Sequence, residues 1–376
     1  MKIAINCSIC QPKGGGITEY IVNLTKNLEI IDHENEYVLY VLQDLYEFCL
    51  TKLPSRFKIK KIPYENNLVS IIKRSLFSQN FWYKEEMEEK FDLFHSPFFY
   101  APQFRKAKIL ITVHDLRLYR YPSTYGFLRY VYLRHVVKET INRTDRIISI
   151  SQFTKDEIIK TCKVESDKIT VILESINRNR FNVKEIEDFQ LDESCKSLEN
   201  GRFLLSVGHI EPRKNYVRLI EAFQMLKKDE KNKDLKLVVV GKPNNKSRQI
   251  IRLLENSDDV IYLNYVPWKL LIWLYKRAEL FVFPSIYEGF GFPPMEAASL
   301  GTLSVVSNVS SIPEVCGDYA IYFNPYDVKD MALQISEGLY NDNLRETKRG
   351  LIEKNLNRFS WKANAEKTLN IYRTMI

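Results

Sequence analysis

The sequence contains few cysteines and no long apolar run. Its six cysteines are scattered over 376 residues, which is too few for the disulfide framework of a small secreted protein and favours a reducing cytoplasm. Its apolar runs, such as residues 270–275 and 280–283, are far short of the roughly 18 residues that a membrane-spanning helix requires. We therefore expect neither a disulfide-rich scaffold nor a segment that crosses a membrane.

Metal ligands at characteristic spacing are also scarce. Cys7 and Cys10 form the one Cys-x-x-Cys pair of the sequence. A zinc site needs two further ligands at similar spacing, and neither a second such pair nor a close pair of histidines occurs. We therefore expect Cys7 and Cys10 to be two small side chains on the turn after a buried strand, and we expect no metal.

The composition is typical of a folded globular protein. Charged residues make up 27% of the chain and apolar residues 45%, which excludes intrinsic disorder and a collagen-like fibre. At about 150 residues per domain, the length predicts two domains, each large enough to bury a sizeable core.

Short β-branched segments alternate with helical patterns along the whole chain. This alternation predicts an α/β fold of βαβ units with parallel sheets. Six strands are expected in the first half, at residues 2–6, 37–42, 93–95, 109–113, 146–149 and 169–172. Six more are expected in the second half, at residues 203–207, 237–240, 260–262, 280–283, 303–306 and 320–323. Thr154 and Glu157 have the spacing of a capping box, which predicts a helix that starts at Thr154.

A polar stretch from Asn177 to Gly201 separates the two series of strands. It shows little hydrophobic periodicity, so we place the domain boundary there, with one domain over residues 1–176 and the other over residues 177–359. Doubly wound sheets bind their ligands at the carboxyl ends of the strands. The residues that carry the chemistry should therefore follow the strands directly.

Two segments at strand exits are suited to an anionic ligand. Residues 14–16 are glycines, followed by a helix that Thr18 opens; glycine lets backbone amides approach an anion, and the helix start adds a positive dipole end. A plain flexible turn would explain the same glycines. Arg213 and Lys214 lie between a strand and a helix, where two cations can neutralise a diphosphate, although a solvated surface pair is the alternative.

A third segment, residues 283–297, is the richest. A buried strand is followed by a loop with two glycines, and then by two prolines that suit the first turn of a helix. Glu288 would lie on the loop and Glu296 in the first helical turns. Carboxylates accept hydrogen bonds from sugar hydroxyls, and backbone amides donate to phosphate. The segment therefore suits a polyhydroxylated ligand that carries phosphate, although a lone exposed glutamate is usually a solvated side chain.

The run from Glu288 to Glu296 also resembles a family signature. Two glutamates separated by seven residues, inside Glu-Gly-Phe-Gly and Pro-Pro-Met-Glu-Ala, are similar to the motif of the retaining nucleotide-sugar glycosyltransferases of the GT-B fold, family four. Other blocks follow the family's order: the glycines at 14–16, Thr-Val-His-Asp at 112–115, Ile-Ser-Gln-Phe-Thr at 150–154, Val-Gly-x-x-x-Pro-Arg-Lys-Asn at 207–215 and Phe-Ser-Trp at 359–361. The resemblance covers nearly the whole chain. It implies two Rossmann-like, doubly wound domains that face a central cleft, with a C-terminal helix over about residues 360–376 packed back on the first.

The resemblance also implies a role for individual residues. Arg213 and Lys214 would hold the diphosphate of the donor. Glu288 would bind hydroxyls of the donor sugar, Glu296 would bind the ribose, and His114 would face the sugar from the first domain. Backbone amides would complete the pocket at Gly15, Gly16, Gly289, Phe290, Gly291 and Phe292. The base would lie near Gly241, Lys242, Val266 and Pro267.

The expected reaction needs neither metal nor cofactor, because the nucleotide sugar is a substrate. No Asp-x-Asp motif occurs in the sequence, which counts against a metal-held diphosphate, so protein cations would stabilise the leaving group. The resemblance implies retention of configuration without a covalent intermediate. Two positions depart from the family: residues 174–177 lack the usual glycine of the turn, and Leu303 replaces a common proline. Local geometry should differ there.

The donor and acceptor are less well determined. Similarity favours mannose from GDP-mannose, with UDP-glucose or another UDP-sugar as the alternative. The expected acceptor is a saccharide, or a polyprenyl-diphosphate-linked saccharide, in surface polysaccharide synthesis. A nucleotide-sugar epimerase of the same fold and a non-catalytic sugar-nucleotide binding module are the other interpretations, although the intact motif residues argue against the second.

The net charge of +8 is concentrated in one stretch. Between residues 101 and 146, ten Lys or Arg residues occur with only three Asp or Glu residues. Within it, residues 127–143 have the pattern of a basic amphipathic helix, with apolar Tyr130, Val131, Leu133, Val136 and Val137. A solvated helix face is one interpretation. The other is a surface for anionic lipid head groups or a diphosphate-bearing substrate, so that the stretch from Arg105 to Arg146 touches the inner membrane face. Nucleic acid is not expected, since no recognition motif accompanies the charge.

Overall fold

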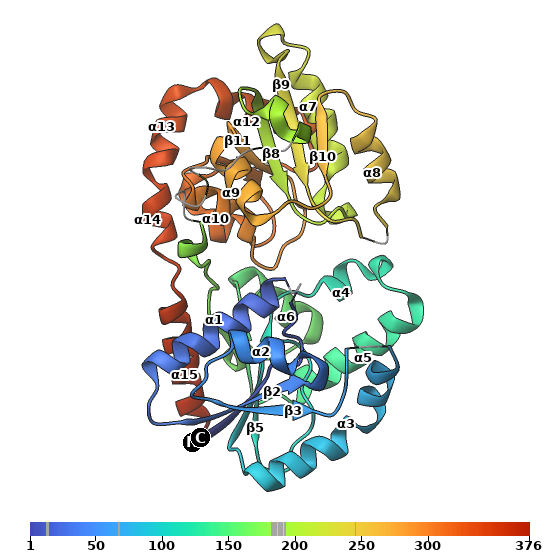
Figure 1. Cartoon of the computed structure of the whole chain (residues 1–376), viewed down its shortest axis with the longest axis vertical. Helices are drawn as coiled ribbons and strands as arrows, with labels where there is room; N and C mark the ends of the chain where they lie inside the picture. The colour runs from blue at the N-terminus through green and yellow to red at the C-terminus, as the bar shows by residue number, and fades with distance from the viewer. Residues whose placement is uncertain (13–14, 67, 182–185, 187–190, 192, 245) are drawn as a thin grey trace. The chain divides into compact units, whose positions relative to one another are not determined.

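The chain folds into two compact units. The computed structural model describes residues 1–12, 15–66, 68–181, 186, 191, 193–244 and 246–376, with the backbone alone for 68–77, 123, 193 and 194. Unit 1 comprises residues 1–175 and 360–376, and unit 2 comprises residues 176–359 (Figure 1). The division falls at residues 175 and 176, beside the start of the polar stretch at Asn177.

Unit 1 is built on a parallel sheet of seven strands. Their order is β3-β2-β1-β4-β5-β6-β7. The strands are β1 (Lys2–Asn6), β2 (Glu36–Leu42), β3 (Lys58–Ile62), β4 (Leu93–Ser96), β5 (Lys108–Val113), β6 (Arg146–Ser149) and β7 (Ile169–Val171). The chain leaves β1 toward β2 and β3 on one side and returns to β4 on the other, so the order of the strands reverses between β1 and β4. Ligands of doubly wound sheets bind at such a reversal.

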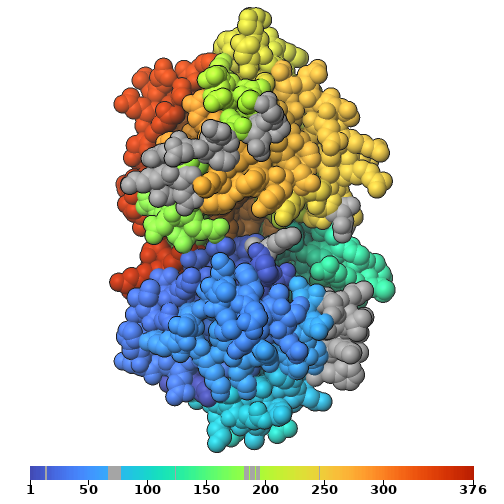
Figure 2. Space-filling model, in the orientation of Figure 1, coloured from blue at the N-terminus to red at the C-terminus, as the bar shows by residue number. Residues whose placement is uncertain are grey.

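Helices cover both faces of this sheet because successive residues of a strand point to opposite faces. Ile3 and Ile5 pack with α1 and α2 on one face, whereas Ala4 belongs to the core of the other face. The blue atoms in Figure 2 show the surface that the α1 side of unit 1 presents. The helices are α1 (Gly16–Ile31), α2 (Tyr46–Lys52), α3 (Leu68–Glu89), α4 (Arg117–Arg120), α5 (Phe127–Arg143), α6 (Gln152–Cys162) and α15 (Trp361–Met375).

Unit 2 repeats the plan with six parallel strands. Their order is β10-β9-β8-β11-β12-β13, which reverses between β8 and β11. The strands are β8 (Arg202–Val207), β9 (Leu235–Val240), β10 (Val260–Leu263), β11 (Leu280–Phe283), β12 (Ser304–Ser307) and β13 (Ile321–Phe323). The helices are α7 (Tyr216–Leu226), α8 (Arg248–Glu255), α9 (Trp268–Arg277), α10 (Phe292–Ser299), α11 (Ile312–Cys316), α12 (Val328–Tyr340), α13 (Asp342–Gly350) and α14 (Ile352–Leu356).

The strands agree with the sequence pattern except for one. All twelve expected strands are present, with ends within two residues of those expected. The pattern missed β3, whose sequence Lys-Ile-Lys-Lys-Ile is basic and lies at the edge of the sheet, where one side of the strand is not paired. An edge strand is less buried than a central one, so its apolar signal is weak.

The predicted N-terminal cap of α6 is wrong by three residues. The residue that caps this helix is Ser151, whose side chain accepts a hydrogen bond from the backbone amide of Thr154. Thr154 therefore lies inside the first turn, and Glu157 pairs with Arg120 instead of closing a capping box. Serine is as good a cap as threonine, and the sequence offers both within four residues.

The cysteines of the Cys-x-x-Cys pair are buried small side chains. Cys7 and Cys10 belong to the core of unit 1, and the amide of Cys10 donates to the carbonyl of Cys7 across a turn, at 3.0 Å. All six cysteines are free thiols. Over the part of the chain that the structure describes, no group of three or more His, Cys, Asp or Glu side chains is arranged to hold a metal ion.

The last helix, α15, packs on unit 1 against α1. Trp361, Leu369 and Tyr372 are buried in the same core as Tyr20 of α1. The hydroxyl of Tyr372 lies 2.7 Å from Nδ1 of His95, on β4. The C-terminal segment thus completes the core of a unit whose other residues precede Ile176.

We expect truncation of Leu369 to destabilise unit 1. Leu369 is 5% exposed, so Leu369→Ala removes buried methyl groups and leaves a cavity, at a cost of about 2–5 kcal/mol in the free energy of unfolding. Urea denaturation of the full chain measures the change. Asn370→Ala, at an exposed position of the same helix, is the control and should have little effect. An equal loss in both variants would contradict the packing described here.

Candidate functional site

The glycines that follow β1 lie at the start of α1. Gly15 is the residue before the helix, which begins at Gly16 without a side-chain cap. A Cβ on Gly15 would meet nothing within 4 Å. The start of α1 is therefore backbone with open space beside it, as an anion site needs. Gly14, the first glycine of the predicted loop, lies outside the described residues.

In unit 2, the two expected cations meet one carboxylate. Glu288 lies in the loop after β11, and its two oxygens lie 2.8 Å from Nη1 of Arg213 and 2.6 Å from Nζ of Lys214. Arg213 and Lys214 form a short turn of 3₁₀ helix, residues 212–214, between β8 and α7. Because β8 and β11 are neighbours at the reversal of strand order, residues 74 positions apart are in direct contact.

Further polar groups fix this cluster. Glu211 lies 2.6 Å from Nη2 of Arg213 and is 1% exposed. The hydroxyl of Ser285 donates to Glu288 at 2.6 Å. Arg213 also donates to the carbonyl of Tyr287 at 2.7 Å. The sequence motifs included Arg213, Lys214 and Glu288 but missed Glu211 and Ser285, whose polarity alone is no signal of a site.

The cluster is largely buried but charged. Burial would raise the pKa of Glu288, yet the charges of Arg213 and Lys214 and the hydrogen bonds to Glu288 outweigh it and lower the pKa to about 2. Burial lowers the pKa of Lys214, and the charge of Glu288 opposes this shift. Two cations thus share the cluster with the carboxylates of Glu211 and Glu288. Arg213 and Lys214 are therefore not a solvated surface pair, and the two carboxylates compensate their positive charge.

The loop that carries Glu288 is held by β12 and the residues that follow it. The amide of Glu288 donates to Ser310 at 3.2 Å, and the Ser311 hydroxyl donates to the carbonyls of Glu288 and Phe290 at 2.9 and 2.8 Å. Gly291 has a φ of 113°, in the left-handed region, and directly precedes α10, which begins at Phe292. Backbone from Gly289 to Phe292 thus forms a turn into a helix start, beside the cation cluster.

Glu296 lies one turn into α10. The hydroxyl of Tyr275, on α9, donates to Oε2 of Glu296 at 2.8 Å. Tyr275 is fully buried, so its pKa is raised well above the usual value and it stays a hydrogen-bond donor. Tyr275 was not predicted, because a tyrosine in an apolar helix has the pattern of a core residue. It orients the carboxylate expected to bind ribose.

The residues expected near the base lie at the exits of β9 and β10. The amide of Gly241 donates to Leu263 at 2.9 Å, and Ile210 donates to Lys242 at 2.9 Å. A Cβ on Gly241 would lie 1.8 Å from the carbonyl oxygen of Gly208, so only glycine fits where these strand exits meet. Val266 is buried, and Pro267 directly precedes α9. The structure therefore brings the exits of β8, β9 and β10 together.

His114 directly follows β5, in unit 1, and both of its ring nitrogens have protein partners. Nε2 lies 2.9 Å from the carbonyl of Pro97, and Nδ1 lies 3.0 Å from the carboxylate of Glu174. A carbonyl only accepts, so Nε2 carries a proton. Burial would lower the pKa of His114, but the charge of Glu174 and its hydrogen bond raise it overall. Glu174 stands in the turn where the family has a different sequence, and the pattern gave it no role.

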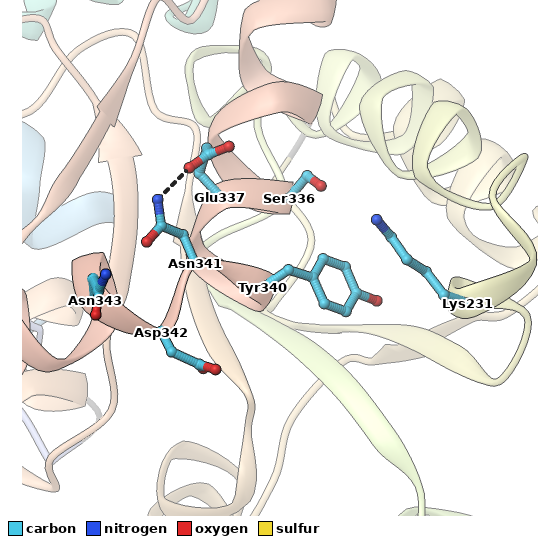
Figure 3. Close-up of a pocket in the computed structure, with 7 residues that line it drawn as sticks. All are labelled: Lys231, Ser336, Glu337, Tyr340, Asn341, Asp342 and Asn343. Carbon is cyan, nitrogen blue, oxygen red and sulfur yellow. Dashed lines mark hydrogen bonds between the residues drawn. The ribbon is translucent and has the colours of Figure 1, made fainter.

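A polar depression of about 480 Å³ lies elsewhere on unit 2, at the end of α12. Figure 3 shows Tyr340 with Lys231 on one side, while Asn341 donates to Glu337 at 2.8 Å. None of its lining residues is a predicted site residue, and they do not follow the strands. We therefore take the strand exits, and not this depression, as the candidate site.

Two family models match the chain in succession. The model "Glycosyltransferase Family 4" matches residues 14–180, and "Glycosyl transferases group 1" matches residues 189–355. Among curated proteins, O-antigen chain mannosyltransferase B of Escherichia coli is 31% identical over 288 residues, which cover 75% of this chain and 74% of that protein. O-antigen chain mannosyltransferase RfbU of Salmonella typhimurium is 35% identical over 221 residues, 58% of this chain and 57% of that protein.

Solved structures share the fold at lower identity. Sucrose-phosphate synthase from Thermosynechococcus elongatus superposes with a TM-score of 0.75 at 17% identity, covering 100% of this chain and 98% of that one. HepE of Anabaena, in complex with UDP-glucose, gives a TM-score of 0.74 at 13% identity, with 100% of both chains covered. At such identity the likeness shows the fold alone.

We expect the Glu288 cluster to make unit 2 sensitive to acid. The pKa of Glu288 is lowered from its ordinary value of 4.5 to about 2, so its contribution to stability is complete above about pH 4.5 and is lost as the pH falls toward 2. The shift corresponds to at most about 3 kcal/mol. Hydrogen exchange of the β8 and β11 amides, measured from pH 6 downward, should show this loss.

The matched variants separate this effect from general acid unfolding. Glu288→Gln should lower protection already at neutral pH, since Lys214 loses its partner, and should flatten the dependence below pH 4.5. Glu230→Gln, at an exposed ion pair with Lys233, should behave as wild type. A Glu288→Gln profile parallel to that of wild type would contradict the prediction.

We expect Glu174 to control the protonation of His114. In Glu174→Gln the carboxylate charge is lost but burial remains, so the pKa of His114 should fall from above 6.5 to below it. In wild type the raised pKa stabilises the fold below about pH 6.5, and this contribution is lost as the pH rises through the folded value. NMR titration of the histidine rings, with His114→Asn for assignment, measures the shift.

Two controls accompany this titration. Glu174→Asp keeps the charge and should keep the pKa of His114 raised. His209, in unit 2, should titrate alike in all variants, with a pKa lowered by burial. If Glu174→Gln leaves the pKa of His114 unchanged, Glu174 does not set it.

Proposed function

Because this chain belongs to the family 4 glycosyltransferases of the GT-B fold, we propose that it transfers a hexose from a nucleotide sugar to a saccharide acceptor during the synthesis of a surface polysaccharide. The observation that carries the proposal is the convergence of Arg213 and Lys214 on Glu288 at the reversal of strand order in unit 2. Cations beside a helix start can bind a diphosphate, and carboxylates accept hydrogen bonds from sugar hydroxyls.

Mannose from GDP-mannose is the donor we favour. The two relatives named above are O-antigen mannosyltransferases, and one of them is matched over about three quarters of both chains. UDP-glucose is the second candidate, because HepE, a neighbour in fold, binds it. The acceptor we propose is a saccharide or a polyprenyl-diphosphate-linked saccharide.

The cation cluster would act on the leaving group. Bond cleavage leaves negative charge on the nucleoside diphosphate, and preorganised cations in a buried site stabilise such charge strongly. Arg213 and Lys214 would contact the diphosphate in place of their present protein partners. Glu288 would accept hydrogen bonds from sugar hydroxyls. Glu296, held by Tyr275, would accept from the ribose. We propose that transfer is metal-independent and retains configuration.

The backbone would supply the remaining donors. In unit 2 these are the amides of Gly289, Phe290, Gly291 and Phe292; in unit 1 they are those of Gly15 and Gly16. His114 would face the donor sugar. Because both ring nitrogens of His114 already have partners, a direct bond from the ring to the sugar would replace one of these contacts. The base would lie near Gly241, Lys242, Val266 and Pro267.

We expect Arg213→Ala or Lys214→Ala to lower turnover by about 10²–10³-fold, the usual loss when a preorganised group that stabilises developing charge is removed. Release of nucleoside diphosphate and elongation of a saccharide acceptor, measured with GDP-mannose and separately with UDP-glucose, test both the reaction and the donor.

Glu296→Ala should weaken the binding of the free nucleoside diphosphate about tenfold, as calorimetry would show.

Several controls bear on these assays. Lys228→Ala, at an exposed position of unit 2, should keep wild-type turnover. Wild-type rates in the Arg213 or Lys214 variants would contradict the assigned role. Donor turnover without an acceptor, giving an epimerised sugar, would indicate an epimerase. Donor binding without release of nucleoside diphosphate under any condition would indicate a binding module.

A further inference from the structure

Helix α5 carries two apolar stripes rather than one. Val137 and Ile141 face the core of unit 1 at 1% and 0% exposure, and Tyr130 and Leu133 are partly buried against it. This first stripe is the one that anchors an amphipathic helix to its sheet. Only part of the predicted apolar face takes this role, since Val131 lies elsewhere on the helix.

The second stripe faces solvent. Phe127 is 77% exposed, Leu128 82%, Val131 49% and Tyr132 46%. Leu128, Val131 and Tyr132 are spaced i, i+3 and i+4, so they lie on one side of the helix. The other exposed large apolar side chains of the described residues are scattered singly along the chain, which is normal for a surface. Four within six residues of one helix form a patch that needs a partner.

Cations border this exposed stripe. Arg129, Arg134 and Lys138 are exposed on the same helix, where Glu139 is the one acidic residue. The guanidinium of Arg129 lies 5.9 Å from the centre of the Tyr125 ring, and Nη1 of Arg134 lies 3.4 Å from the Tyr130 hydroxyl. Arg143, in contrast, donates to the carbonyl of Ala101 and does not belong to the border. Helix α5 belongs to the teal segment that reaches the surface of unit 1 in Figure 2.

We propose that this half of α5 binds an anionic lipid bilayer and lies in the plane of its surface. Apolar side chains bordered by cations are what an interfacial helix offers: the apolar stripe enters the boundary between head groups and acyl chains, and the cations meet lipid phosphates. An aromatic residue such as Tyr132 suits the level of the head groups. No helix in the described parts of the chain has the length and apolar character to span a membrane.

Two other occupants fit the surface less well. A stable protein partner buries about 800 Å² on each side, whereas this stripe consists of four side chains on fewer than two turns of the helix. A second copy of the chain across a two-fold axis would place the same cations against one another. An anionic lipid surface neutralises them.

This inference deepens the proposed function, because a polyprenyl-linked acceptor is held in a bilayer. Only this link to the acceptor rests on the proposed function. Vesicle binding is measured without donor or acceptor, so it succeeds or fails independently of transfer. A chain that binds vesicles but transfers no sugar would contradict the proposed function and leave the lipid surface in place.

The test is flotation of the full chain with vesicles of phosphatidylglycerol and with vesicles of phosphatidylcholine. Wild type should float with the anionic vesicles and lose this binding as salt is raised. It should bind the neutral vesicles at least about tenfold more weakly. Phe127→Ser combined with Leu128→Ser should reduce binding to the anionic vesicles about tenfold or more. Arg134→Gln combined with Lys138→Gln should weaken binding and reduce its salt dependence.

Matched variants decide between this surface and a general effect of charge or apolarity. Ile30→Ser with Leu333→Ser removes two exposed apolar side chains elsewhere, and Lys228→Gln with Lys367→Gln removes two exposed cations elsewhere; both pairs should bind as wild type. Equal losses in these controls, or no flotation of wild type, would overturn the proposal. So would light scattering that finds a dimer which the Phe127→Ser and Leu128→Ser changes dissociate.

Discussion

The candidate site depends on a single, largely buried carboxylate held between two cations. Glu288 contacts Arg213 and Lys214 at 2.8 and 2.6 Å, and its lowered pKa keeps it ionised. Burying these charges is costly unless each has a partner. The cluster therefore has to be complete before any ligand arrives, and Glu211 and Ser285 complete it. Under the proposed function, a diphosphate would meet cations that are already positioned.

Parallel strands next to each other make this cluster possible. β8 and β11 are adjacent at the reversal of order, and the amide of Ile286 donates to the carbonyl of Arg213 at 2.8 Å. Backbone conformation adjusts the loops: Asn215 and Gly291 both have positive φ, and Gly241 approaches Gly208 too closely for any side chain. These backbone requirements shape the strand exits at which the proposed contacts to base, sugar and phosphate would lie.

Two contacts within unit 1 hold the segments where the chain leaves this unit and where it returns. Glu174, one residue before unit 1 is left, contacts His114 at 3.0 Å, and the side chain of Asn364, just after the return, donates to the carbonyl of Leu173 at 2.9 Å. The residue expected to face the donor sugar is thus bonded to the connection itself. The departure of residues 174–177 from the family pattern has a physical counterpart in this ion pair.

Much of this protein follows from its sequence. Strand positions, the fold class and the motif residues at strand exits depend on local patterns, because periodicity and turn chemistry act over a few residues. The edge strand β3 and the partners Glu174 and Tyr275 depend on contacts between separate segments. The cap at Ser151 is a local contact, which the pattern missed because Thr154 offered a second capping residue. The two apolar stripes of α5 show the same limit: the sequence identifies its apolar residues, but only packing against the sheet decided that Val137 is buried and Leu128 exposed.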